Sequence, residues 1–471
     1  MAKDLSSLRA LAEEHGQGHI FQWWDRLDEA GRSALLAQAA EVDFPLVTRL
    51  VAEHLGKAAA SVGLGDLRPA EAIPVPRTEE ETAAHRHAAD TGEKAIRAGQ
   101  VAALVVAGGR GTRLGYDGPK GTFPAGPITG KSLFQLHAEK LRAASRRYGA
   151  IIPWYIMTSE ATDAATRAYL DQESYLGFRR EDVCLFQQAS IPAVGLDGKV
   201  LLADKGQIAT SPNGHGGTLQ ALRDSGALDD MRRRGIRHIS YLQVDNPLIK
   251  AVDPAFLGYH IERGSDFSSK ALPKRDAEEG LGVFCYAGGK LRVVEYSDLP
   301  QHYKYAARID GSLVFSAGNI AIHAISVAFL ERLTAEGLSL PYHRANKKVS
   351  CLDPAGRRIE PEQPNAVQFE MFIFDALEHA RNPVVLMVER WEEFAPIKRA
   401  EGEDSPDTAR QAQVNQFARW LEEAGVAVPR DRQGNAFGRI EISPLYALDA
   451  EELRQRLPKD LRLTVELNLQ P

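Results

Sequence analysis

Cysteine is scarce in this chain of 471 residues, which contains only Cys184, Cys285 and Cys351. The three lie far apart and include no C-x-x-C pair, so the sequence encodes neither a disulfide framework nor a cysteine-based zinc site. Sparse, unpaired cysteine fits a reducing compartment, and we expect a cytoplasmic protein.

Long hydrophobic runs are also missing. No apolar stretch reaches the ~20 residues that span a bilayer. The first residues lack the apolar core of a standard secretory signal. We therefore expect neither a membrane-spanning protein nor a membrane partner.

An excess of positive charge is absent as well. Lys and Arg number 57 against 63 Asp and Glu, which gives a net charge of -6. A nucleic-acid-binding protein needs a basic field, so nucleic acid is not an expected partner. What is present, 44% hydrophobic and 25% charged residues, is the mixture of a globular protein.

The texture of the chain changes twice, and we expect three regions. Apolar residues between Leu5 and Leu55 recur at helical spacing, which predicts an N-terminal helical region over residues 1–97. Strand and helix patterns alternate over residues 98–383, the predicted catalytic domain, as in a parallel sheet with helices on both faces. Residues 384–471 are predicted to form a small mixed domain. The predicted fold class is α/β, with a Rossmann-like, mostly parallel central sheet.

The elements of the central region can be placed from its apolar runs. We expect buried strands at 101–106, 151–157, 183–186 and 238–244, and a hairpin within 283–296. We expect helices at 132–148, 161–170 and 218–234.

A glycine-rich loop follows the first predicted strand. It reads GGRGTRLG at 108–115, with Pro119-Lys120-Gly121 shortly after. Glycines let a backbone approach a nucleotide closely, and free amides bind phosphate oxygens. Arg113 and Lys120 would add the fixed positive charge that a reacting polyphosphate requires. We predict a nucleotide-binding loop, with contacts from Gly108, Gly109, Gly111 and Thr112.

Two other phosphate motifs fit less well. The dinucleotide fingerprint G-x-G-x-x-G fails at 109–115, because one residue too many precedes the last glycine. A relaxed Walker A pattern at 125–132 begins with Ala, contains Pro127 and follows no strand. We interpret 125–132 as a loop, with Ser132 near the cap of the next helix.

Asp245 comes directly after the apolar run 238–244. The carboxyl end of a central strand is the usual ligand side of an open α/β sheet. A carboxylate there suits Mg²⁺ that bridges phosphates, because such an ion uses only one or two protein carboxylates. A cap before Asn246-Pro247 is the alternative interpretation.

Six further motifs follow in order, at 153–159 (PWYIMTS), 186–188 (FQQ), 244–246 (VDN), 293–297 (VVEYS), 317–321 (AGNIA) and 394–398 (FAPIK). With the glycine loop they resemble the eukaryotic-type UDP-N-acetylhexosamine pyrophosphorylases of the UDPGP type 1 family, over roughly residues 20–470. The resemblance implies a GT-A-like nucleotidyltransferase fold and a uridylyltransferase that makes UDP-sugar and pyrophosphate from UTP and a hexose 1-phosphate, with Mg²⁺.

The resemblance also implies roles for single residues. The positions that match the family's uracil, phosphate and sugar contacts are, in that order, Gln188 with Gly214, Lys120 with Lys398, and Gly282 with Glu295 and Asn319. A carboxamide suits the first role, because it can both donate to and accept from an imide edge.

The loop PNGHGG at 212–217 departs from the hexosamine pattern. His215 stands where hexosamine enzymes have Asn, and Gly-His-Gly is more similar to UDP-glucose and broad UDP-sugar pyrophosphorylases; Ser316 is a second departure. We expect His215 to bind the sugar. The overall match favours N-acetylglucosamine 1-phosphate as that sugar, whereas the histidine at this position favours glucose 1-phosphate. A nucleotide-sugar-binding regulatory protein is the non-enzyme alternative. The retained Arg113 and Lys398 argue against it, because a mere binder needs no full cationic set.

Overall fold

The computed structural model describes residues 4–55, 66–458, 461 and 466–471. They form two compact units. The first holds the described residues of Met1–Gly63 together with Gln188–Thr218 and Leu340–Asp375; the second holds those of Leu64–Gln187, Leu219–Ser339 and Ala376–Pro471. Each unit is assembled from segments that are distant in sequence. The three regions expected from the sequence, 1–97, 98–383 and 384–471, follow chain order, and their boundaries stay a prediction.

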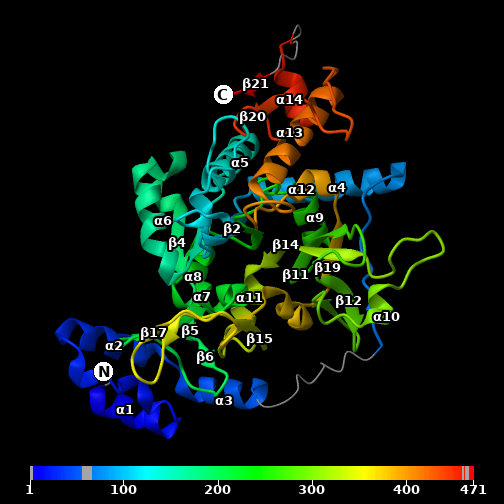
Figure 1. The fold of residues 1–471 in the computed structure, drawn as a ribbon. Helices are drawn as coiled ribbons and strands as arrows, with labels where there is room; N and C mark the ends of the chain where they lie inside the picture. Colours follow the sequence, from blue (N-terminus) through cyan, green and yellow to red (C-terminus); the bar gives the residue numbers. More distant parts are fainter. Residues whose placement is uncertain (1–3, 56–65, 459–460, 462–465) are drawn as a thin grey trace. The chain divides into compact units, whose positions relative to one another are not determined.

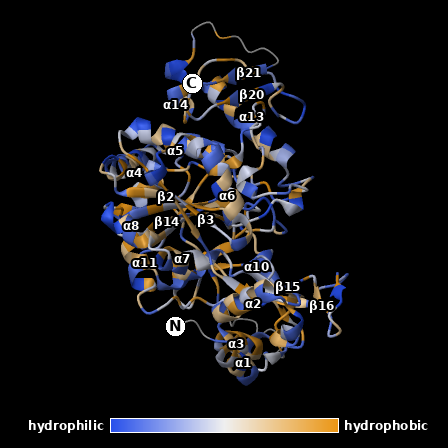
Figure 2. Cartoon of the chain, turned by 90° about the vertical axis from the view of Figure 1, so that its left-hand side faces the viewer, coloured by the Kyte–Doolittle hydropathy of each residue, from blue (hydrophilic) through white to orange (hydrophobic). Residues whose placement is uncertain are grey.

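The second unit is built on a ten-stranded sheet among the described residues. Its parallel part contains β10 (His238–Gln243), β2 (Val101–Val106), β3 (Trp154–Thr158) and β4 (Val183–Gln187), in that order. β2 and β3 are buried along their whole length, as expected for strands covered on both faces. In Figure 2 these strands are the apolar centre of the unit. The predicted α/β fold is confirmed.

The other half of this sheet is mixed. β14 (Ala317–Ser326) pairs antiparallel with β10 and with β11 (Phe267–Pro273), and β19 (Val384–Met387) runs parallel to β11. The predicted hairpin is present as β12 (Val283–Ala287) and β13 (Lys290–Val294). Its two loop glycines have φ of 57° and 78°, the conformation that a two-residue hairpin turn favours. The strictly parallel segment is therefore smaller than the alternating pattern indicates.

Helices α4 (Glu79–Arg97), α5 (Leu133–Tyr148), α6 (Glu160–Gln172) and α9 (Pro254–Glu262) accompany the sheet (Figure 1). α4 and α9 cross at glycines: a Cβ at Gly92 would lie 1.9 Å from the carbonyl oxygen of Pro254, and one at Gly258 would lie 1.7 Å from that of Ala88. Only glycine allows backbones to approach so closely.

One predicted helix is wrong as a single element. Residues 218–234 form α7 (Thr218–Asp224) and α8 (Ala227–Arg233), separated at Gly226. Gly226 has φ of 76°, which is left-handed and ends a helix. Ser132, by contrast, caps α5 as expected: its Oγ accepts from the Gln135 N–H at 3.0 Å.

The first unit contains the expected N-terminal helices, α1 (Leu5–Glu14), α2 (Glu29–Glu41) and α3 (Phe44–His54). They share an apolar core with β18 (Ala366–Met371). β18 pairs with β15 (Tyr342–Lys347) and β6 (Val194–Gly195) in a small sheet.

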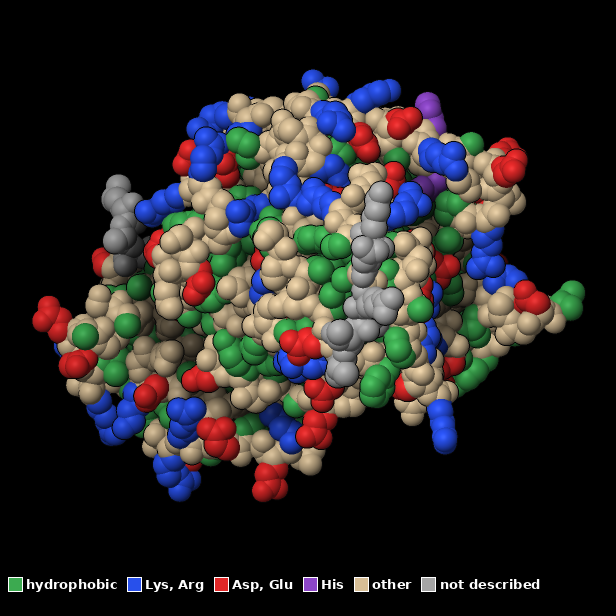
Figure 3. Space-filling model, turned by 90° about the horizontal axis from the view of Figure 1, so that it is seen from above, with side chains coloured by type: hydrophobic (Ala, Val, Ile, Leu, Met, Phe, Trp, Pro, Cys, Tyr) green, Lys and Arg blue, Asp and Glu red, His purple; other side chains and the backbone are tan. Residues whose placement is uncertain are grey.

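The end of the chain has an apolar cluster of its own within the second unit. α13 (Pro406–Glu423), β20 (Arg439–Ile442), α14 (Ala450–Arg456) and β21 (Glu466–Leu469) lie together in Figure 1. On the face shown in Figure 3, basic and acidic side chains are interspersed. Among the described residues, no helix has the length and apolarity to cross a membrane.

Candidate active site

The glycine loop begins where β2 ends, at the carboxyl edge of the parallel strands. The Gly108 carbonyl accepts a hydrogen bond from the Ser159 hydroxyl at 2.7 Å, so the end of β3 supports the loop. The loop then closes on itself, because the Lys120 N–H donates to the Gly109 carbonyl at 2.9 Å. A Cβ at Gly109 would meet no heavy atom within 4 Å, so the backbone there is open to an approaching ligand.

The middle of the loop needs glycine for a different reason. A Cβ at Gly111 would lie 2.9 Å from the backbone oxygen of Tyr116. Thr112 and Arg113 follow in a short 3₁₀ turn, Thr112–Leu114, and both are exposed. The loop therefore presents backbone and two guanidinium groups, those of Arg110 and Arg113, to solvent, which suits a phosphate-binding loop.

Lys120 and Asp245 form an ion pair at this edge. The Lys120 Nζ lies 3.2 Å from the Asp245 Oδ2, and the two side chains are 18% and 15% exposed. Gly121 next to the lysine allows the turn to pack on Phe134, whose ring a Cβ would meet at 2.2 Å. Two residues predicted separately, for phosphate and for metal, are thus in direct contact.

Lys398 belongs to the same region. The Ile397 N–H donates to the Asp245 carbonyl at 2.8 Å, which places the segment 394–398 beside the end of β10. The Lys398 side chain is exposed, with its Nζ 5.8 Å from the centre of the Phe394 ring. The structure therefore places the backbone next to Lys398 beside the Lys120–Asp245 ion pair.

Asp245 is a lone carboxylate in terms of metal binding. In the part of the chain that the structure describes, no three His, Cys, Asp or Glu side chains are arranged to hold an ion. This donor set does not suit an all-protein metal site. It does suit Mg²⁺ carried largely by phosphates, which needs one or two protein carboxylates.

The three predicted sugar-binding residues of the second unit also converge. The Asn319 N–H donates to the Gly282 carbonyl at 2.8 Å, and a Cβ at Gly282 would lie 3.1 Å from the Glu295 Oε1. The Asn319 Oδ1 accepts from the Ala321 N–H at 2.9 Å, which leaves its Nδ2 to donate. Ala321 has φ of 55°, an unusual left-handed conformation for alanine that holds the amide in place.

Gln188, Gly214 and His215 belong to the first unit. Gln188 is buried. Gly214 has φ of 87°, and a Cβ there would lie 2.4 Å from the Met371 carbonyl oxygen. Glycine is thus required for the loop to pass β18.

His215 is held by its own unit. Its Nδ1 accepts from the Ile373 N–H at 3.2 Å, and its ring lies parallel to Phe372, 5.4 Å between centres. Burial, aided by His343, lowers the pKa of His215 to about 4. The imidazole is therefore neutral near pH 7 with its proton on Nε2, and it presents an N–H donor.

Comparison with known proteins identifies the family. The sequence profile described as UTP--glucose-1-phosphate uridylyltransferase (UDPGP) matches residues 67–433. The chain belongs to the UDPGP family. The resemblance inferred from the glycine loop and the six motifs is thereby confirmed.

This UDPGP-family chain is similar along nearly its whole length to several proteins. It is 38% identical to UDP-N-acetylhexosamine pyrophosphorylase-like protein 1 of Xenopus tropicalis, with 96% of this chain and 94% of the other covered. It is 34% identical to UDP-N-acetylglucosamine pyrophosphorylase of Saccharomyces cerevisiae, with 96% and 97% covered. The crystal structure of uridine diphosphate N-acetylglucosamine pyrophosphorylase from Trypanosoma brucei in complex with inhibitor has a TM-score of 0.84 at 28% identity and covers 100% and 99%.

Ser159 is a contact of the glycine loop that the sequence analysis did not single out. Its position was the available signal, because it closes the strand motif 153–159 next to the loop strand.

The Walker-like loop of this family member binds part of its own chain. The N–H groups of Ile128 and Thr129 donate to the Glu441 carboxylate at 2.6 and 2.9 Å. Lys131 pairs with Glu139 at 2.7 Å. The interpretation of 125–132 as a structural loop is confirmed.

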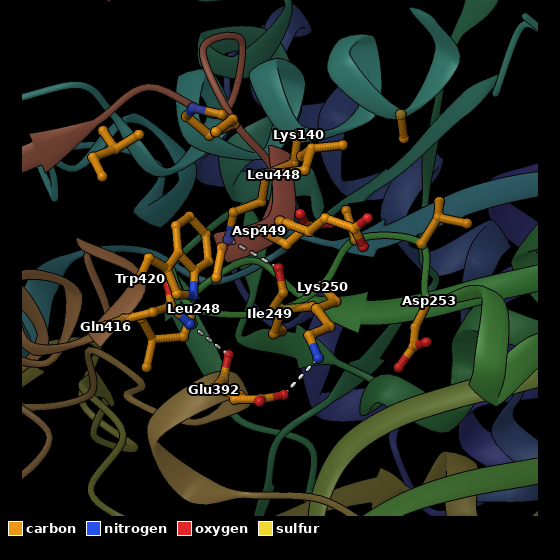
Figure 4. A pocket seen from close by; sticks show the side chains of 18 of the residues that line it. Lys140, Leu248, Ile249, Lys250, Asp253, Glu392, Gln416, Trp420, Leu448 and Asp449 are labelled. Carbon is orange, nitrogen blue, oxygen red and sulfur yellow. Dashed lines mark hydrogen bonds and ion pairs between the residues drawn. The ribbon is translucent and has the colours of Figure 1, made fainter. Parts of the chain in front are cut away.

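A cavity of about 550 Å³ lies beyond the Asp245 segment (Figure 4). Its wall includes Leu248, Lys250, Glu392 and Trp420, and of the described residues it includes none predicted for the site. Lys250 pairs with Glu392 at 2.5 Å. Lys140 from α5 reaches the same cavity, and burial lowers its pKa to about 7.

Proposed function

We propose that this member of the UDPGP family transfers the uridylyl group of UTP to N-acetylglucosamine 1-phosphate and releases pyrophosphate, with Mg²⁺ as cofactor. The observation that carries the proposal is the Lys120–Asp245 ion pair, which lies beside an open glycine loop and next to the segment that carries Lys398. Such a set of fixed charges at the ligand edge of an α/β sheet suits the transfer of a charged phosphoryl group.

The reaction is an in-line displacement. An oxygen of the sugar phosphate attacks the α-phosphorus of UTP, a P–O bond forms, and the bond to the β-phosphate oxygen breaks to release pyrophosphate. The nucleophile is already anionic, so no covalent enzyme intermediate and no general base are needed. The work of the protein is to position the reactants and to stabilise charge.

Each group of the second unit then has a task. The amides of Gly109 and Gly111 hold phosphate oxygens, while Arg113, Lys120 and Lys398 offset the negative charge that moves toward the leaving pyrophosphate. Asp245 would hold Mg²⁺, which supplies charge neutralisation between phosphate oxygens. The Lys120 Nζ is held 3.2 Å from Asp245, so the cation for the phosphates and the carboxylate for Mg²⁺ lie side by side.

The choice of sugar rests on the residues around Gly282. An acetamido group offers one N–H and one carbonyl, and Glu295 and the Asn319 Nδ2 offer the matching acceptor and donor. The similar proteins from Xenopus and yeast carry hexosamine names. His215 and the glucose-based name of the family profile favour the alternative, a UDP-glucose or broad UDP-sugar pyrophosphorylase.

One experiment tests the proposal. Purified protein with UTP and Mg²⁺ is given a panel of sugar 1-phosphates, and pyrophosphate release is followed. We expect the highest kcat/KM with N-acetylglucosamine 1-phosphate. Higher kcat/KM with glucose 1-phosphate would establish the alternative. UTP binding without pyrophosphate release from any member of the panel would favour a regulatory protein.

A further inference from the structure

A buried network joins the segment that carries Asp245 to the segment that carries Lys398. Neither residue lies in a regular element: Asp245 follows β10, and Lys398 follows α12 (Arg390–Glu393). Loop residues move readily unless their backbone groups are bound. Stabilisation of a reacting phosphate requires charges that stay fixed, so the means of fixing these two segments matters for turnover.

Asn246 is the direct connection. Its side chain is buried, with 2% exposed. Its Nδ2 donates to the Glu393 carbonyl at 2.6 Å, and its Oδ1 accepts from the N–H groups of Ala395 at 3.1 Å and Leu248 at 3.3 Å. Both ends of the carboxamide are therefore used, and the bonds cross from one segment to the other. The Ile397 N–H, bound to the Asp245 carbonyl, adds a backbone connection.

Glu393 connects this junction to the central sheet. It is fully buried, accepts from the Lys250 N–H at 3.2 Å and pairs with Lys270 of β11. Lys270 is also fully buried and lies 2.7 Å from Asp253. Burial opposes its charge, but Asp253 and Glu393 outweigh burial and raise the pKa of Lys270. The junction thus rests on a charged lysine that is fixed in the sheet.

Helix α5 holds the Asp245 segment from another side. The His137 Nε2 donates to the Val244 carbonyl at 2.9 Å. One turn further, the Lys140 Nζ donates to the carbonyls of Pro247 and Ile249 (Figure 4). The backbone on both sides of Asp245 and Asn246 is therefore bound, and the Asn246 side chain joins this backbone to the Lys398 segment.

We propose that Asn246 is a positioning residue for uridylyl transfer, which keeps the Asp245 carboxylate and the Lys398 segment at the separation that the reacting phosphates need. It touches neither substrate in this role and acts through hydrogen bonds to Glu393 and Ala395. The proposal rests on the proposed function of the site, because it assigns Asn246 a part in that reaction.

The test compares Asn246→Ala with Asn415→Ala in the full-length protein. Asn415 is a matched control: in α13 it also uses both ends of its carboxamide, at 2.8 Å to the Ala436 N–H and 3.0 Å to Asn435, away from the phosphate residues.

In hydrogen exchange, we expect the amides of Leu248 and Ala395 to exchange faster in Asn246→Ala but not in Asn415→Ala. We expect its kcat to fall ~10²-fold, as for a displaced catalytic group, with a higher Mg²⁺ requirement and nearly unchanged KM for the sugar phosphate.

The rates are normalised to the folded fraction, and the outcomes separate the two proposals. Equal losses of kcat in Asn246→Ala and Asn415→Ala overturn the positioning role, as does unchanged exchange at Ala395. If Asn246→Ala does not fold, Asn246→Asp is used, because it keeps an acceptor for Ala395 and replaces the donor to Glu393 with an oxygen. The exchange criterion at Ala395 does not apply to this variant, and a loss of kcat at nearly unchanged KM, larger than that of Asn415→Ala, is then required of it. A wild-type protein that shows protected amides but no pyrophosphate release overturns the proposed function, and the positioning role falls with it.

Discussion

The ammonium group of Lys120 lies 3.2 Å from the carboxylate of Asp245, across 125 residues of sequence. Each group offsets the charge of the other while no ligand is bound. Both side chains are more than four-fifths buried, so the pair is shielded from most solvent screening. Removing either charge leaves the other in place without its partner, so the two residues are coupled and the single variants are read together with the double variant.

Lys120→Ala should lower kcat by ~10²–10³-fold, the usual cost of losing one electrostatic contact to a transition state. Lys131→Ala is the control, because Lys131 lies in the Walker-like loop and pairs with Glu139. We expect the control to keep near-normal kcat. Steady-state pyrophosphate release measures the kcat of both variants. Equal kcat values for Lys120→Ala and Lys131→Ala would exclude Lys120 from the reaction.

Asp245→Asn should raise the Mg²⁺ concentration needed for half-maximal rate, because the amide keeps the shape of the side chain and loses its charge. The measurement is a Mg²⁺ titration of turnover at saturating UTP. Superimposable titrations of the variant and the wild type would assign Asp245 a structural role as a cap.

His215→Asn should raise kcat/KM for N-acetylglucosamine 1-phosphate relative to glucose 1-phosphate, because the variant has the carboxamide of the hexosamine pattern. One polar contact is worth ~1–3 kcal/mol, or roughly a ten- to hundredfold change in selectivity. Competition between the two sugar phosphates measures the ratio. An unchanged ratio would show that His215 does not read the sugar.

The pH dependence of stability should reflect buried neutral histidines. Burial lowers the pKa of His137 to about 4, whereas an unfolded chain has the ordinary value near 6.5. Below pH 6.5 the unfolded state therefore binds a proton that the folded state does not, and the free energy of unfolding falls until about pH 4, by up to ~3 kcal/mol for one such group. Denaturant unfolding at pH 7 and pH 5 measures the loss.

His137→Gln is the matched variant for that measurement. Glutamine has an N–H to donate to the Val244 carbonyl and has no proton to gain in this range. The difference in unfolding free energy between pH 7 and pH 5 should shrink relative to the wild type. A difference of the same size would show that His137 is not part of the acid response.

The sequence predicted the elements with strong periodicity and the residues that carry chemistry, but not which of them meet. The apolar runs placed β2 and β10 within a residue or two, and both ends of the Lys120–Asp245 pair were singled out. Their contact depends on the parallel pairing of those strands, which no local pattern encodes. The antiparallel entry of β14 between β10 and β11 has the same origin, because alternation of strands and helices does not specify strand direction.

Other differences come from single residues. The apolar spacing of residues 218–234 continues past Gly226 and predicts one helix. The left-handed φ of Gly226 nevertheless ends the helix there, and periodicity does not reveal this conformation. Asn246 lies in the VDN motif at 244–246, but its hydrogen bond to Glu393 joins residues that are 147 positions apart in the sequence. No local pattern predicts such a contact. The sugar-site residues were assigned by resemblance, and the hydrogen bond between Asn319 and Gly282 shows only that they are neighbours.

Glu441 links the C-terminal region of the chain to the Walker-like loop. Its carboxylate accepts two N–H groups and the Thr129 hydroxyl of a loop whose letters suggest phosphate binding. The protein thus supplies a counter-ion from its own C-terminal region to amides that would otherwise attract a free anion. A chain shortened before β20 would lack Glu441 and leave these three donors unsatisfied beside the start of α5. Inorganic phosphate could then bind to donors that Glu441 occupies in the intact protein.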